Sequence, residues 1–175
     1  DSPITAQLLY NGDIAVADWY LLHKIQTYSL PVRSWPGARK ISNKRCRRCD
    51  ALDETIAHVF CLCNFSSKFW LARHNAVASF IATQLRRNID CEVTIDTESV
   101  FTTSRLRPDL QVKIPSKSSI FLIDIKCSYE KEDNIDRVNE ANLFHYSDLI
   151  KSIQAAWSGW KVSCHTIVVG IPGAW

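Results

Sequence analysis

Four cysteines and one histidine, all potential metal ligands, lie close together between residues 46 and 63. The segment reads CRRCDALDETIAHVFCLC, so the C-x2-C pair of Cys46 and Cys49 is followed by His58 and then by Cys61 and Cys63. Two thiolates from a tight turn, together with a histidine and a further cysteine, can complete a tetrahedral zinc site. We expect Cys46, Cys49, His58 and Cys63 to hold Zn²⁺, because the H-x4-C spacing covers a little more than one helical turn. Cys61 is the alternative fourth ligand.

The other interpretation of these cysteines is that they are small buried apolar residues, as cysteine often is. Disulfides are not expected, because the first residues, DSPITAQLLYNGD, show no basic region followed by an apolar core and hence no secretory signal. A structural zinc ion would contribute about 10 kcal/mol or more to the folding of this segment. The remaining cysteines lie beside or within apolar segments and are expected to serve in packing; they are Cys91, Cys127 and Cys164.

The composition places the chain among globular proteins. Of its 175 residues, 46% are hydrophobic, 22% are charged and only 5 are glycine, which is neither a disordered nor a fibrous composition. No segment approaches the roughly 18 uninterrupted apolar residues that cross a bilayer, so no membrane partner is expected. The length suits one domain, or one domain with a small satellite. The absence of methionine indicates a piece of a longer protein.

Positive charge is concentrated just before and within the cysteine run. Residues 31–49 contain no acid, although the net charge of the whole chain is only +3. Such a density of positive charge suits a phosphate backbone, where each neutralised phosphate releases counterions; the alternative is a solvated basic linker. The candidate nucleic-acid-binding residues here are Arg39, Lys40, Lys44, Arg45, Arg47 and Arg48, and Arg33 belongs to the same run.

Hydrophobic periodicity predicts an α/β fold with a mixed sheet flanked by helices. A small CCHC zinc knuckle and an N-terminal helix are expected to precede this core. We expect an N-terminal helical segment over residues 1–30, a basic linker with the zinc knuckle over 31–64, and the core over 65–175. Helices are predicted over residues 14–28, about 66–87 and about 135–157, and strands over 91–103, 107–114, 119–126 and 161–170.

Two acidic residues lie on neighbouring predicted strands. Residues 115–118, PSKS, form a turn of hairpin length, and pairing about its centre places Asp109 opposite Asp124. Two such close carboxylates repel each other unless a cation lies between them, and Mg²⁺ or Mn²⁺ with oxygen ligands fits. Lys126 shares a strand face with Asp124 and could orient a water or stabilise developing negative charge. The simpler alternative is a surface salt bridge between Lys126 and Asp124 at the end of a strand.

Several motifs together carry a resemblance to a known family. RPDL at 107–110 and IDIK at 123–126 resemble the PD-(D/E)xK signature of restriction-type nucleases. One group of proteins in particular has a similar order of motifs. In this chain the order is the cysteine knuckle, RHN at 73–75, the two motifs above, HYSDL at 145–149 and VVGIPGAW at 168–175. That group is the restriction-like endonuclease region of site-specific non-LTR retrotransposon proteins, and the resemblance covers roughly residues 28–175.

The resemblance implies roles for individual residues. Asp109 and Asp124 would bind the catalytic Mg²⁺ or Mn²⁺, and Lys126 would be the catalytic lysine. Many members of the group place a lysine in the following helix, where this chain has His145 before Tyr146. The RHN motif would position DNA phosphates. Accessory candidates are Tyr146, Glu130 and Glu98, and the residues of the RHN motif are Arg73, His74 and Asn75.

The implied function is a metal-dependent DNA endonuclease that nicks target DNA to prime reverse transcription of a non-LTR retrotransposon. Its partners would be double-stranded target DNA, the element RNA and an upstream reverse transcriptase domain of the same polyprotein, and its location would be nuclear. An alternative of a different class is a non-catalytic, zinc-dependent nucleic-acid-binding module with a degenerate nuclease fold. A further alternative is a structural tether whose N-terminal helix contacts the polymerase through Trp19, Leu21 and Leu22.

Overall fold

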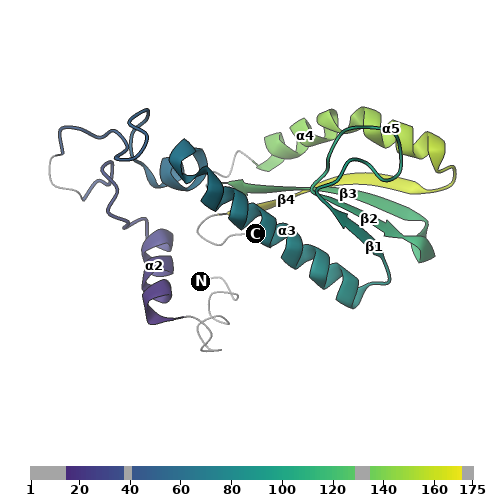
Figure 1. Ribbon diagram of the computed structural model, residues 1–175, viewed down its shortest axis with the longest axis horizontal. Coiled ribbons are helices and arrows are strands. Elements are labelled where there is room, and N and C mark those ends of the chain that lie inside the picture. Colours follow the sequence, from purple (N-terminus) through teal and green to yellow (C-terminus); the bar gives the residue numbers. More distant parts are fainter. Residues whose placement is uncertain (1–14, 38–40, 129–134, 171–175) are drawn as a thin grey trace. The chain divides into compact units, whose positions relative to one another are not determined.

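The computed structural model describes residues 15–37, 41–128 and 135–170 (Figure 1). The chain forms two compact units, one made mainly of residues up to 71 and the other mainly of residues 72–126 and 135–168. The domain boundaries expected at 30/31 and 64/65 stay predictions. Among the helices that the structure describes, none combines the length and the apolar character that crossing a bilayer requires. The candidate residues Arg39, Lys40 and Glu130, and the side chains of Trp19 and Leu22, lie outside the described part of the chain.

The first unit begins with helix α2, Val16–Gln26, which confirms the predicted N-terminal helix. The helix stops where Tyr28 takes a left-handed conformation with φ of 53°. Ile25, Leu30 and Ile56 then form a small hydrophobic cluster. After the basic segment come the π-helix His58–Leu62 and the 3-10 helix Asn64–Ser66, which leads into helix α3, Ser67–Asn88. Leu21 on α2 is exposed, and its contact with a polymerase stays a prediction.

The second unit contains a four-stranded sheet with the strand order β1-β2-β3-β4. Strand β2 pairs antiparallel with both β1 and β3. Lys161 N, at the start of β4, donates to the carbonyl of Ser118, just before β3, at 2.8 Å, so these two strands start side by side. A parallel pair needs a crossover connection, and helices α4 and α5 provide it. The predicted mixed sheet is confirmed, with the bounds β1 Glu92–Ile95, β2 Leu110–Ile114, β3 Ser119–Ser128 and β4 Lys161–Gly170.

The hairpin between β2 and β3 has the predicted register. Its pairs run from Ile114 with Ser119 to Leu110 with Ile123, so the next residues in this register are Asp109 and Asp124. The connection is the 3-10 turn Pro115–Lys117, closed by Ser118 with φ of 45°. The hairpin therefore brings the two aspartates to the same end of adjacent strands, as the turn length predicts.

Each face of the sheet carries its own hydrophobic core, because alternate strand residues point to opposite faces. Helix α3 covers one face, and helices α4 and α5 cover the other (Figure 1). The core on the α3 face contains Ala78, Ala82, Val93, Leu110, Val112, Ile114 and Ile125. The core on the other face contains Ile120, Leu122, Tyr146, Leu149, Ile153, Val162 and Cys164.

The single long helix predicted over residues 135–157 is instead two helices. Helix α4 spans Ile135–His145 and α5 spans Ser147–Ala156, with Tyr146 between them at φ −95° and ψ 5°. The backbone bonds from Tyr146 N to Asn142 O and from Ile150 N to Tyr146 O continue across the break. The Tyr146 ring is buried and its hydroxyl has partners on the sheet side, so tertiary contacts accompany the local departure from helical geometry.

The first strand is shorter than its alternating sequence predicts. It stops at Ile95, because Asp96 adopts a left-handed conformation with φ of 44°. The following loop is held by the buried amide of Gln111, which donates to the carbonyls of Thr97 and Glu98 at 3.1 Å and accepts from Val100 N at 3.0 Å. A side chain on β2 therefore satisfies backbone groups that a longer β1 would have paired within the sheet.

Candidate functional site

The first unit brings together the four residues predicted to bind zinc. The ligand atoms of Cys46, Cys49, His58 and Cys63 all lie within 4.8 Å of one another. Cys46 Sγ lies 3.9 Å from Cys63 Sγ, and Cys49 Sγ lies 3.2 Å from His58 Nε2. Metal–sulfur bonds of about 2.3 Å in a tetrahedron imply sulfur–sulfur distances of about 3.8 Å, whereas a disulfide requires about 2.05 Å. The spacing and chemistry of these donors therefore fit Zn²⁺.

The first two ligands come from a tight knuckle. Asp50 N donates to the carbonyl of Cys46 at 3.0 Å, and Asp50 itself is left-handed with φ of 54°. The backbone N–H of Arg48 points at Cys46 Sγ, with a separation of 3.5 Å. Burial raises the pKa of the Cys46 thiol, but the backbone N–H groups of Arg48 and Cys49 outweigh this effect, so its pKa is lowered overall. A lowered pKa favours the thiolate, which is the form that binds metal.

The other two ligands lie at the ends of a π-helical turn. Cys63 N donates to the carbonyl of His58, five residues earlier, at 2.8 Å. In an α-helix, residues five apart differ in direction by about 140°, so they do not share a face. The wider π-turn brings His58 and Cys63 to the same side, and such turns recur at functional sites. This geometry selects Cys63, because Cys61 lies outside the group of four ligands.

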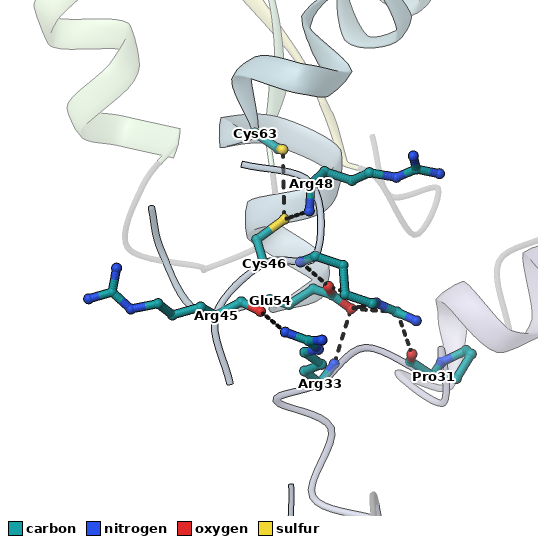
Figure 2. A network of polar contacts seen from close by, with 8 residues as sticks. Pro31, Arg33, Arg45, Cys46, Arg48, Glu54 and Cys63 are labelled. Carbon is teal, nitrogen blue, oxygen red and sulfur yellow. Dashed lines mark hydrogen bonds and ion pairs between the residues drawn. The ribbon is translucent and has the colours of Figure 1, made fainter. Parts of the chain in front are cut away.

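The buried carboxylate of Glu54 accepts hydrogen bonds from the backbone of the knuckle (Figure 2). Glu54 is only 3% exposed, and its Oε2 accepts from Arg47 N at 2.8 Å and from Arg47 Nε at 2.9 Å. Its Oε1 accepts from the backbone N–H of Arg33 at 3.2 Å. The hydrogen bonds from Arg47 lower the pKa of Glu54 to about 2. Because Arg47 lies between the zinc ligands Cys46 and Cys49 in the sequence, this ion pair ties the knuckle to the chain around it.

We expect Glu54→Gln to lower the local free energy of unfolding of the zinc-loaded knuckle by about 1.5 kcal/mol at pH 7, because it removes the charge of a buried carboxylate whose partner guanidinium is about half exposed. The pKa of Glu54 is depressed in the folded state, so its stabilisation is complete above its ordinary pKa of 4.5 and is lost as the pH falls toward about 2. Native-state hydrogen exchange of the amides of residues 45–63 measures the change. Asp53→Asn, at an exposed neighbouring acid, is the matched control, and equal protection in the two variants would contradict the assignment.

The predicted nucleic-acid-binding residues of the basic segment differ in their surroundings. Lys44 is exposed, whereas the Arg47 side chain donates to Glu54 and to the carbonyl of Pro31. Arg45 Nη1 donates to the carbonyl of Asp50 at 2.9 Å, and the Arg48 guanidinium lies 5.1 Å from the centre of the Phe65 ring. Part of the positive charge therefore has a structural partner within the knuckle, which charge density alone does not reveal.

In the second unit, Asp109 lies where helix α3 approaches the β2–β3 hairpin. Its Oδ2 accepts from Ile125 N at 2.6 Å and lies 3.2 Å from His74 Nε2. His74 Nε2 is also 3.1 Å from the carbonyl oxygen of Ile125, which can only accept, so this nitrogen must donate. Burial raises the pKa of Asp109, and the charge of Asp124 raises it further, against the opposing effect of the donors Ile125 and His74.

Asp124 is buried and meets three donors. Its Oδ2 accepts from Lys126 Nζ at 2.6 Å and from Asn142 Nδ2 at 2.7 Å, and its Oδ1 accepts from the Tyr146 hydroxyl at 3.2 Å. Burial and the neighbouring charge of Asp124 raise the pKa of Tyr146, so its hydroxyl remains a donor. The structure thus brings Asp124, Lys126 and Tyr146 together, as three of the predicted site residues.

Asn142 is a site residue that sequence reasoning missed. It is buried in helix α4 and also donates to Thr166 Oγ1 on β4 at 3.0 Å, so it connects the carboxylate of Asp124 to the next strand. The sequence feature that could have indicated Asn142 is its position: it lies one helical turn before Tyr146, on a helix face whose other residues are mostly apolar. A polar residue on such a face needs a buried partner, and the sequence does not say which.

The remaining candidates lie at more peripheral positions. Arg73 is half-buried, and the exposed Asn75 has its Oδ1 3.3 Å from His74 Nδ1. Glu98 forms an exposed ion pair with Arg107 at 3.5 Å, and the exposed His145 packs its ring against that of Tyr146.

Within residues 15–37, 41–128 and 135–170, the zinc ligands are the only group of three or more His, Cys, Asp or Glu side chains placed to hold a metal ion.

In the comparison with known protein families, residues 5–70 match the family described as zinc-binding in reverse transcriptase. Comparison with curated protein sequences finds no similar protein. The matched segment contains all four zinc ligands and ends before His74, Asp109 and Asp124. The first unit thus carries a zinc-binding module of the kind associated with reverse transcriptase proteins. The second unit is a mixed α/β fold outside that match.

Proposed function

We propose that the second unit is a metal-dependent DNA endonuclease of the restriction-like type. Its role would be to nick target DNA and thereby prime reverse transcription of a non-LTR retrotransposon. The observation that carries this proposal is the β2–β3 hairpin, whose register brings Asp109 and Asp124 to the same end of adjacent strands with Lys126 on the Asp124 carboxylate. The reverse-transcriptase-type zinc module in the same chain supports the retroelement context.

The donor chemistry of the acidic pair fits a hard divalent cation. Two carboxylates and the backbone carbonyl of Ile125 offer only oxygen, which Mg²⁺ and Mn²⁺ prefer. The raised pKa of Asp109 reflects burial and repulsion by Asp124, and a bound cation would offset that repulsion. Asp109 and Asp124 would hold the ion. When bound, it would polarise a phosphoryl oxygen and lower the pKa of a water molecule.

The protein's own residues would orient this site. Asn142 on α4 and the Tyr146 hydroxyl donate to Asp124, and His74 on α3 and the Ile125 backbone N–H donate to Asp109. Carboxylates held in this way need little rearrangement when substrate arrives. Lys126 is 45% exposed at its side chain, so its ammonium can contact a phosphate oxygen of DNA while remaining near Asp124.

In this proposal the zinc module joins the nuclease to a reverse transcriptase within one polyprotein. Target DNA and the element RNA would be its nucleic-acid partners, and cleavage of chromosomal DNA would place the protein in the nucleus. The exposed Lys44 and the RHN motif, Arg73 to Asn75, are the proposed contacts to phosphates.

The direct test is incubation of supercoiled plasmid with the purified full chain and Mg²⁺ or Mn²⁺. Nicked circles are expected in the presence of the divalent ion. Because EDTA would also remove zinc, the informative control is protein dialysed against Zn²⁺ buffer with Mg²⁺ and Mn²⁺ omitted. Equal nicking with and without the added ion would contradict metal-dependent cleavage by this chain.

One observation favours a second candidate, a non-catalytic nucleic-acid-binding module. The Asp124 carboxylate is buried and already has three donors, which is also how a purely structural carboxylate is satisfied. That module would bind DNA or RNA through the basic segment and the zinc knuckle without cutting it. The same plasmid assay separates the two candidates, since binding without nicking in Mn²⁺ favours the module.

A further inference from the structure

Two phenylalanines beside the zinc cluster point into solvent, and a cation lies near each ring. Phe65 is 55% exposed and Phe69 is 64% exposed. The Arg48 guanidinium lies 5.1 Å from the centre of the Phe65 ring, and Lys68 Nζ lies 5.0 Å from the centre of the Phe69 ring. We call Arg48, Phe65, Lys68 and Phe69 the aromatic surface. Each ring therefore offers a ligand an exposed aromatic face with a positive charge nearby.

The zinc cluster holds the aromatic surface in place. The carbonyl of Cys63 accepts from Ser66 N at 2.8 Å and from the indole Nε1 of Trp70 at 3.5 Å. These bonds attach the 3-10 turn that carries Phe65, and the first turn of α3 that carries Phe69, to a zinc ligand. Because the backbone of both rings is fixed in this way, a ligand would not have to order it.

The charge around the aromatic surface selects its ligand. Residues 55–71, which carry both rings, contain neither aspartate nor glutamate and include Lys68. The guanidinium of Arg48 points away from the Glu54 carboxylate (Figure 2). A polyanion suits such a surface, whereas a protein partner with mixed charges would find no acidic residue in this stretch with which to pair its own cations.

We propose that the aromatic surface binds single-stranded nucleic acid, with bases stacked on Phe65 and Phe69 and phosphates contacted by Arg48 and Lys68. Exposed aromatic rings and nearby cations are the combination by which proteins bind single strands with little dependence on sequence. A duplex keeps its bases inside its own stack, so it would meet the cations but not the rings. The surface therefore distinguishes single strands from duplexes, which the basic charge alone does not.

This inference goes beyond the proposed nuclease and does not depend on it. All four residues of the aromatic surface lie in the first unit, whereas Asp109 and Asp124 lie in the second. A chain that fails to nick plasmid can still bind single strands through this surface. A chain that nicks plasmid with normal dependence on the acidic pair can still lack such binding.

The test measures fluorescence anisotropy of the full chain with a labelled oligothymidine and with a blunt duplex of the same length. Phe65→Leu and Phe69→Leu keep an apolar side chain but remove the ring. Each is expected to raise the Kd for the single strand at least about fivefold, the lower end of one stacking contact. Phe69→Tyr keeps the ring and should retain the wild-type affinity. Phe80→Leu is the matched control, since Phe80 is 57% exposed on the same acid-free helix but belongs to the second unit.

Salt dependence tests the cations of the same surface. Arg48→Gln and Lys68→Gln should each reduce the slope of log K against log salt by about 0.7 for the single strand. Zinc content, measured for every variant, shows whether the knuckle is intact. The proposal is overturned if the Phe65→Leu/Phe69→Leu double variant, with zinc bound, keeps the wild-type Kd. It is equally overturned if the double variant loses duplex affinity as much as single-strand affinity, or if Phe80→Leu weakens binding to the same extent.

Discussion

Replacing Asp109 or Asp124 with asparagine is expected to lower DNA nicking by about a hundredfold or more in Mg²⁺ or Mn²⁺. Asparagine keeps the shape of the side chain and one acceptor oxygen but removes the negative charge that would hold the cation. A hundredfold loss corresponds to about 2.7 kcal/mol of transition-state stabilisation, a modest share of what a bound divalent ion supplies. Asp109 and Asp124 would hold the same ion, so both variants should show a similar loss.

The nicking assay on supercoiled plasmid needs a control for folding, because Asp124 is buried and has three donors. Hydrogen exchange in β2 and β3 reports whether the sheet remains intact in each variant. Asp148→Asn is the matched substitution, since its carboxylate is 91% exposed and pairs only with Lys151 across one turn of α5. Wild-type nicking by the Asp109→Asn/Asp124→Asn double variant would exclude the acidic pair as the catalytic site.

The second large effect is expected on the zinc module. Cys49→Ser removes one of four ligands and should abolish tight zinc binding, with a loss of order 10 kcal/mol in the folding free energy of the knuckle. Hydrogen exchange should then show loss of protection at Cys46 N and Cys63 N, whose backbone bonds close the knuckle and the π-turn. Protection in the strands of the second unit should persist, because the second unit has its own hydrophobic cores.

Zinc content by atomic absorption, measured alongside hydrogen exchange, completes this experiment. Cys61→Ser is the matched control, because Cys61 lies in the same π-turn but outside the group of four ligands. One zinc per chain is expected for Cys61→Ser and none for Cys49→Ser. The reverse result, or full zinc content in both variants, would contradict the assignment of Cys46, Cys49, His58 and Cys63.

Local sequence signals were sufficient for the order of most elements and for the hairpin that pairs the two aspartates. A four-residue connection leaves few ways to join two strands, so the register from Ile114–Ser119 to Leu110–Ile123 follows from the turn length and the hydrophobic alternation. The break at Tyr146 could not be predicted in the same way. Helical periodicity runs straight through that residue, and its partners Asp124 and Arg107 are distant in the sequence.

In the basic segment, too, the sequence does not show which contacts each charged side chain makes. The sequence contains Arg47 within a dense positive run, which indicates contacts to phosphate. Its guanidinium instead pairs with the buried Glu54, seven residues later, while Arg48 beside it extends toward the exposed ring of Phe65. Adjacent arginines of identical chemistry thus take different roles, because the knuckle directs one side chain to Glu54 and the other to Phe65.

The sequence by itself determined the types of zinc ligand, the α/β class and the facing positions of Asp109 and Asp124, because each depends on spacing along a short stretch of chain. Only the tertiary structure decided between Cys61 and Cys63, because the π-turn that aligns Cys63 with His58 forms in the context of the surrounding knuckle. The tertiary structure alone also brought His74 to Asp109 and Asn142 to Asp124. Those contacts depend on how helices pack on opposite faces of the sheet, and packing of this kind has no signature in local sequence.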